Sequence, residues 1–256
     1  MTPIYLSLLL GLLLLAVPGY MIYAYDRLSW RAPALAVVRM LVQLSVMGAL
    51  LWAVYRYDSV WLCLLWLLIL VVAASFMMVS RSGLNSRTLF VPASVAMFVS
   101  VLGVSLYLLY VVFAPTDGSP FSARWFVPVT GVLMAHVLTT NIPAVRTYFD
   151  SLRQDSQPYL TLLGNGGSRL QALAPYVTRA LRSLTTPAVA NLSAMGLFVV
   201  PMLLSGLLLG GMEPLQAVCT FVVLMLACMA ASVLTLGLTL WLADRKAFNQ
   251  RGQLMI

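Results

Sequence analysis

Few side chains in this 256-residue sequence could carry out chemistry by themselves. His136 is the single histidine, so one chain cannot supply several histidines to a metal ion. Cys63, Cys219 and Cys228 lie inside apolar runs, and we interpret them as free thiols that pack like small hydrophobic residues. The seven Asp and Glu residues lie at or beyond the ends of those runs, so the sequence offers no buried pair of carboxylates for a proton relay.

Nucleotide hydrolysis by this chain is not expected either. The phosphate-binding motif GxxxxGK[ST] needs its lysine to reach the phosphates, and the only lysine, Lys246, follows Arg245. Met225, Cys228 and Met229 could share a helix face that suits a soft metal such as Cu(I), but methionine is more often a filler of helix cores. We therefore expect no enzyme activity, no cofactor bound by this chain and no assigned metal site.

A glycine-rich segment is the strongest candidate for contact with a partner protein. Gly164, Gly166 and Gly167 predict a flexible turn, and Ser168 is a favourable N-cap for a helix over about 169–184. Apolar residues then recur every three or four positions and predict one apolar stripe, with arginines on the other side: Leu170, Leu173, Val177, Leu181 and Leu184 against Arg169, Arg179 and Arg182. The helix could lie on the membrane surface, or its turn could insert into a partner and pass motion to Pro187.

Polar residues inside the apolar runs are the second group of candidates. Arg39 and Gln43 share one helix face, and they either snorkel and pack or line a polar path. A patch around His136 lies between Pro128 and Pro143, and it either joins helices or faces a substrate. The candidate lining residues are Arg39, Gln43, His136, Asn141 and Asn191. Gly206 and Gly210 form a GxxxG pair that suits close helix packing within or between subunits.

The composition shows which elements must position these residues. Hydrophobic residues make up 62% of the chain and charged residues only 9%, against roughly 25% charged in a typical soluble domain. This composition excludes a soluble enzyme and a disordered chain, and three cysteines exclude a disulfide scaffold. We predict an all-α, polytopic integral membrane protein, a single domain over 1–256 with about seven spans of roughly 20 residues: about 4–25, 33–55, 60–80, 89–113, 125–144, 188–211 and 215–243.

The basic residues predict the orientation. With the N-terminus outside, 12 of the 15 basic residues fall in inner segments, while Arg56 and Arg124 fall outside and Arg39 lies within a span. The net charge of +8 is therefore interpreted as topogenic, with no nucleic-acid partner, and the topology is N-out and C-in. The one sizeable soluble segment, 146–186, is then cytoplasmic and amphipathic, and it is where a cytosolic partner would dock.

Several short motifs follow one another in the order and spacing of a bacterial ABC-permease family. The sequence resembles the family of the iron-export permease FetB, to which a plant aluminium-tolerance half-transporter is similar. The resemblance covers nearly the whole chain, and it rests on Arg39-x-x-x-Gln43-Leu44-x-x-x-Gly48, Ala73-Ala74 followed by Arg81, Gly166-Gly167-Ser168-x-x-x-Ala172-x-x-Pro175, Arg179-Ala180-x-Arg182, Pro187, Gly196, Pro201, Gly206 and Gly211-x-x-Pro214-Leu215-x-Ala217.

The resemblance implies a seven-span permease of the bacterial inner membrane that forms a homodimer. It implies export of iron or another metal, driven by a separate cytosolic ATPase that uses ATP and Mg²⁺. The ATPase would bind a segment that includes Gly164, Gly166, Gly167, Ser168, Arg169 and Ala172. The chain departs from the family pattern at several polar positions, such as Leu160, Ala135-His136 and Phe221. Two alternatives therefore stay open: an ABC permease for a non-metal substrate, and a membrane scaffold or regulatory subunit that transports nothing.

Overall fold

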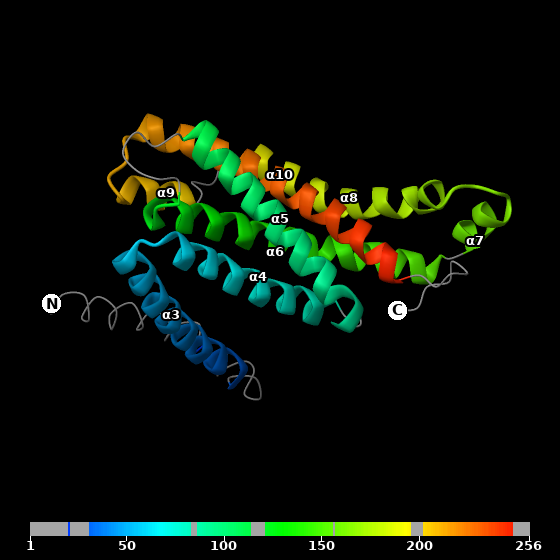
Figure 1. Cartoon of the computed structure of the whole chain (residues 1–256), viewed down its shortest axis with the longest axis horizontal. Coiled ribbons are helices and arrows are strands. Elements are labelled where there is room, and N and C mark those ends of the chain that lie inside the picture. Colours follow the sequence, from blue (N-terminus) through cyan, green and yellow to red (C-terminus); the bar gives the residue numbers. More distant parts are fainter. Residues whose placement is uncertain are drawn as a thin grey trace. The chain divides into compact units, whose positions relative to one another are not determined.

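The computed structural model describes residues 20, 31–82, 86–113, 121–155, 157–195 and 202–247 (Figure 1). Within these ranges every regular element is a helix, which confirms the all-α prediction. The predicted span 4–25 lies outside the described residues except for Tyr20. The chain forms two compact units, Met1–Tyr57 and Asp58–Ile256.

The described helix of the first unit is α3, Arg31–Tyr57. Its apolar stretch, Ala34–Tyr57, matches the predicted span 33–55 to within two residues and is long enough to cross a bilayer. One hydroxyl on it is satisfied within the helix, because Ser45 Oγ donates to the Leu41 carbonyl at 2.9 Å. Arg39 and Gln43 both lie on α3 with exposed side chains.

Long apolar helices make up most of the second unit. They are α4 (Val60–Ser82), α5 (Ser86–Tyr107) with a π-helical turn η1 (Leu108–Val112), α6 (Ala123–Gln154) and α10 (Pro214–Ala247). In the described part of the chain, α3, α4, α5 with η1, α6 and α10 are long and apolar enough to span a membrane. These helices confirm the predicted spans 33–55, 60–80, 89–113, 125–144 and 215–243 as helical elements.

The predicted sixth span, 188–211, is not one helix. Its first residues continue α8 (Arg169–Ala194), which ends with Met195 as its C-cap, and α9 is a separate helix, Met202–Leu209. Pro187 was expected to begin a new span, but it lies inside α8. A proline removes one backbone hydrogen bond and kinks a helix, and here the helix passes through it.

Helix α6 lies at the centre of the second unit, in contact with α4, α5, α8 and α10. Four of its side chains are among the largest that are fully buried: Phe126, Leu133, Tyr148 and Phe149. Fully buried alanines on the neighbouring helices, such as Ala93, Ala96 and Ala231, leave room for close approach. Since lipid does not drive apolar helices together, this close packing is what holds a membrane bundle together.

A carboxylate fixes one end of α6. The Ala123 backbone N–H donates to Asp58 Oδ1 at 2.6 Å, and Ser122 Oγ donates to Asp58 Oδ2 at 3.3 Å. A negative charge at a helix N-terminus satisfies free N–H groups and complements the helix dipole. Cys63 Sγ on α4 also donates to the Phe121 carbonyl at 3.3 Å, so the turn before α4 and the start of α6 are tied together.

Candidate coupling site

The glycine-rich turn joins two helices at one end of the second unit. Helix α7 spans Gln157–Gly164, and α8 begins at Arg169. Figure 1 shows α7 at the end of the unit where α10 ends, while α9 lies at the end where α10 begins. The turn is therefore close to the C-terminus of α10 and far from its start.

The turn has a defined backbone conformation. Gly166 has a φ of +81°, its N–H donates to the Leu163 carbonyl at 3.1 Å, and the Gly167 N–H donates to the Leu162 carbonyl at 2.9 Å. These two bonds with a left-handed glycine form a Schellman motif, which closes the C-terminus of α7. The flexibility predicted from the sequence stays a prediction, and in this structure the two left-handed and close-packed glycine positions serve to end α7.

Gly167 is restricted by contact with α7. A Cβ atom added there would lie 2.8 Å from the Leu162 carbonyl oxygen and 3.0 Å from Leu162 Cγ. Such distances do not occur without movement of the backbone. A Cβ at Gly164 would meet no atom within 4 Å. The turn therefore needs glycine at Gly166 for its φ and at Gly167 for space, but not at Gly164.

Ser168 starts α8 as the sequence predicts. Its hydroxyl accepts a hydrogen bond from the Gln171 backbone N–H at 3.3 Å, and the Gln171 side chain accepts one from the Ser168 N–H at 3.0 Å. This reciprocal pair is a capping box. A Schellman motif and a capping box in direct succession hold the exposed turn in one shape.

The buried face of α8 differs from the predicted leucine stripe. Leu170 is 81% exposed, although Leu173 and Leu184 are buried. The buried residues of α8, whose main neighbour is α6, instead include a row of residues four apart: Ala172, Tyr176, Ala180, Leu184 and Ala188. Three alanines in this row let the backbones of α8 and α6 approach closely. Ala172, a candidate coupling residue, therefore lies on the packed face of α8.

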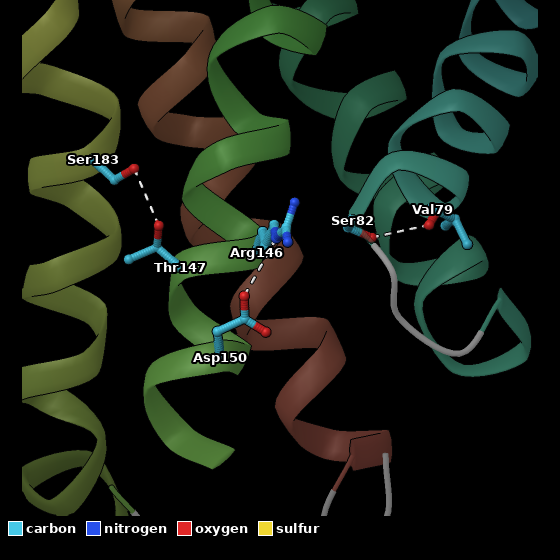
Figure 2. A network of polar contacts seen from close by, with 6 residues as sticks. All are labelled: Val79, Ser82, Arg146, Thr147, Asp150 and Ser183. Atoms are coloured by element: carbon cyan, nitrogen blue, oxygen red, sulfur yellow. Dashed lines mark hydrogen bonds and ion pairs between the residues drawn. The ribbon is translucent and has the colours of Figure 1, made fainter. Parts of the chain in front are cut away.

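Polar contacts also fasten α8 to α6. Tyr176 donates a hydrogen bond to the Asp155 carbonyl, and Arg179 lies 3.6 Å from an Asp155 carboxylate oxygen. Burial is the main reason that the pKa of Tyr176 is raised. Figure 2 shows the next link along the two helices, where Thr147 Oγ1 donates to Ser183 Oγ at 3.3 Å.

A further group joins α8 to α10. Arg169 Nη2 donates to the Asp244 backbone carbonyl, and the Tyr148 hydroxyl of α6 donates to Asp244 Oδ1 at 2.8 Å. Burial raises the pKa of Tyr159 on α7, Arg169 lowers it and Asp244 raises it, so Tyr159 lies within electrostatic range of both. Neither Tyr148 nor Asp244 was among the site residues predicted from the sequence. The one local signal was an acid at the end of the last apolar run.

The candidate lining residues belong to both units and differ in exposure within them. Asn141 is fully buried between α6 and α10, where its Nδ2 donates to the Ser232 carbonyl at 3.2 Å. His136 is half-buried on α6, and Asn191 is exposed near the end of α8. Arg39 and Gln43 belong to the first unit, whose position relative to the second is not described. Beside Asn141, Thr140 Oγ1 donates to Ser232 Oγ at 3.0 Å.

We expect replacement of Asn141 by leucine to destabilise the α6–α10 contact. The variant loses an interhelical hydrogen bond, and such bonds in membrane proteins average about 0.6 kcal/mol with a maximum near 1.7 kcal/mol. Thermal unfolding of the purified protein in detergent would measure the loss. Asn191→Leu is the matched control, because the Asn191 side chain is exposed. Equal stability of the two variants would contradict a packing role for Asn141.

The glycines Gly206, Gly210 and Gly211 lie within α9 or directly after it. Gly206 lies within α9, and a Cβ there would meet no atom within 4 Å. Gly210 follows the helix, and Gly211, with a φ of +85°, closes it: the Gly211 N–H donates to the Leu208 carbonyl and the Met212 N–H to the Leu207 carbonyl. Glycine here is accounted for by helix termination, and the predicted packing role of Gly206 and Gly210 stays a prediction.

An apolar cavity of about 650 Å³ lies between α5 and α10. Its walls include Val99, Gly103 and Tyr107 from α5 and Leu226, Ala230 and Leu234 from α10. Among the described residues, no group of three or more His, Cys, Asp or Glu side chains is placed to hold a metal ion. The cavity is therefore suited to apolar contacts, with α10 as one of its two walls.

A model of an uncharacterised protein family, UPF0014, matches residues 5–248 of the chain. The chain belongs to this family. Its members include "UPF0014 membrane protein slr1647" of Synechocystis sp., which is 28% identical over 85% of this chain and 83% of that protein. No solved structure matches the chain.

Two other relatives of the chain carry names that refer to metals. "Protein ALUMINUM SENSITIVE 3" of Arabidopsis thaliana is 26% identical over 82% of this chain and 71% of its own length. "Probable iron export permease protein FetB" of Escherichia coli is 24% identical over 98% of this chain and 94% of its own length. The predicted resemblance is thus confirmed, and the chain is a divergent, membrane-embedded member of a permease-like family.

Proposed function

We propose that this chain is the transmembrane permease subunit of an ABC exporter and that a separate cytosolic ATPase drives it. The carrying observation is the ordered turn between α7 and α8, which projects a Schellman motif and a capping box at one end of the helical unit. A rigid, exposed element of this kind suits insertion into a partner. Likeness to a protein named as a probable iron export permease supports export of iron or a related metal cation.

The proposal includes an arrangement in the membrane. The protein would sit in a bacterial inner membrane with about seven spans, N-terminus outside and C-terminus inside, and would form a homodimer. Support comes from the distribution of the basic residues and from the absence of a phosphate-binding motif in the sequence, so the motor must be another chain. ATP and Mg²⁺ would be bound by that partner.

Co-purification tests the proposal. The chain should co-elute with an ABC ATPase expressed from a neighbouring gene, and it should raise the rate of ATP hydrolysis by that ATPase. Absence of both effects, with the permease correctly inserted in the membrane, would overturn the proposal. A non-cognate ABC ATPase is the control for non-specific binding.

A non-metal substrate is the second candidate, and one observation favours it. The cavity between α5 and α10 is lined almost entirely by apolar side chains, and the hydroxyls of Ser100 and Tyr107 are the polar side-chain groups among its lining residues. An export assay would separate the two candidates. Export of ferrous iron by the complex of permease and ATPase would reject the non-metal substrate. ATP-driven flux of either kind would reject a scaffold that transports nothing.

A further inference from the structure

We infer that Tyr148 and Asp244 are positioning residues that connect the α7–α8 turn to α10, so that a displacement of the turn moves the helix that lines the membrane cavity. The inference rests on the proposed function, because it assumes that a partner ATPase acts on the turn. In this inference the motion passes to α10, whereas the sequence predicted that it passes along α8 to Pro187.

The first step is the contact between the turn and α10. Arg169 is the first residue of α8, directly after the Ser168 cap, and its guanidinium donates to the Asp244 carbonyl. Since the turn is held rigidly by its two caps, a movement of the turn carries Arg169 with it. The hydrogen bond from Arg169 would then displace the C-terminal end of α10.

The second step is the contact that fixes Asp244 to the bundle. Tyr148 is fully buried on α6, and its hydroxyl donates to Asp244 Oδ1 at 2.8 Å. The ring also packs edge-on against Phe149, with ring centroids 5.0 Å apart. Tyr148 therefore holds the Asp244 side chain at a fixed place while Arg169 holds its backbone, and α6, α8 and α10 meet at this residue.

The third step compares the two routes by which motion could leave the turn. The route along α8 passes Pro175 and Pro187, each of which removes a helical hydrogen bond and softens the helix. Helix α10 has its one proline at its first residue, Pro214, and is 34 residues long. Between Asp244 and the cavity residues Leu226, Ala230 and Leu234, α10 contains Gly237 but no proline, so no residue in this stretch removes a helical hydrogen bond.

Proteoliposomes that contain the permease and its ATPase provide the test, with ferrous iron as the transported probe. Tyr148→Phe removes only the hydroxyl, and Asp244→Asn removes the charge of its acceptor. We expect both variants to bind the ATPase and to support hydrolysis within about twofold of wild type, while iron transported per ATP falls about five- to tenfold. The double variant should show no further fall, since Asp244→Asn weakens the same hydrogen bond that Tyr148→Phe removes.

Asp150→Asn is the matched control. Asp150 lies on α6 near Tyr148 and pairs with Arg146 at 3.4 Å, but the pair is exposed and touches neither α8 nor α10 through that contact (Figure 2). The Asp150→Asn variant should transport as much iron per ATP as the wild-type protein does. The inference would be overturned if Tyr148→Phe, Asp244→Asn and Asp150→Asn all transported the same amount of iron per ATP.

Hydrogen exchange gives a second measurement that does not depend on the substrate. Addition of ATP to the wild-type complex should change exchange both in the turn, residues 157–172, and in α10, residues 232–244. In Tyr148→Phe the change should be confined to the turn, and its persistence in α10 would overturn the inference. A wild-type permease that neither binds nor stimulates the ATPase would overturn the proposed function, and this inference with it.

Discussion

Replacement of Gly166 by valine is expected to weaken binding of the partner ATPase by about tenfold or more. Gly166 has a φ of +81°, which a β-branched residue adopts only at a cost of roughly 1–2 kcal/mol. Loss of the left-handed residue opens the Schellman motif, and the α7–α8 turn then no longer presents one shape. Co-elution of the permease with the ATPase at graded concentrations would measure the loss.

Asparagine at the same position is the matched control. Asparagine adopts the left-handed conformation more readily than other non-glycine residues and is the second choice at this place in a helix ending. Gly166→Asn should therefore keep most of the binding, with correct membrane insertion in both variants. Equal binding by the valine and asparagine variants would show that the turn conformation is not what the ATPase recognises.

Labelling with a membrane-impermeant thiol reagent should give an all-or-none result for the two sides of the membrane. Native Cys63 and Cys228 are buried and Cys219 is exposed, so Cys219→Ser gives a suitable background. In intact cells, Arg124→Cys should react and Asn165→Cys should not, because Arg124 is assigned outside and Asn165 lies in the turn that is assigned inside.

Opened membranes are the control for this experiment. Both cysteines lie at positions that are exposed in the structure, so both should react once the inner face is accessible. Reaction of Asn165→Cys in intact cells would place the turn outside. It would then be out of reach of any cytosolic ATPase, and the proposed function would fail.

Local sequence signals predicted the elements whose causes are local. Ser168 and Gln171 are three residues apart, and their capping box depends on nothing beyond that stretch. Runs of apolar residues likewise marked α4 and α10 to within a few residues, because the bilayer sets a minimum helix length.

The same signals could not mark where a helix leaves the membrane and continues. The apolar part of α6 ends near Ala144, yet the helix runs on to Gln154 through Arg146, Asp150 and Arg153. These charged residues mark the end of the apolar stretch, but the helix continues through them. The contact between Tyr148 and Asp244 is less predictable still, because it joins positions 96 residues apart and depends on which helices are neighbours.

The face of α8 shows a different limit. Hydrophobicity predicted that Leu170 belongs to the buried stripe. However, small residues allow the closest packing of a membrane helix, and the buried face of α8 is the one that carries Ala172 and Ala180. Leu170 is left exposed beside the turn. Alanines recur every eighth position, at Ala172, Ala180 and Ala188, and this pattern is the sequence signal that could have found this face.

Iron flux into sealed, inside-out vesicles most directly tests the claim that this chain is a gate whose motor is another molecule. Vesicles that hold the permease and its ATPase should accumulate ferrous iron when ATP is added outside. Vesicles with the permease alone, or with an ATPase that lacks its phosphate-binding lysine, should accumulate none and hydrolyse no ATP. Nucleotide hydrolysis or ATP-driven iron accumulation by the isolated permease would contradict the account.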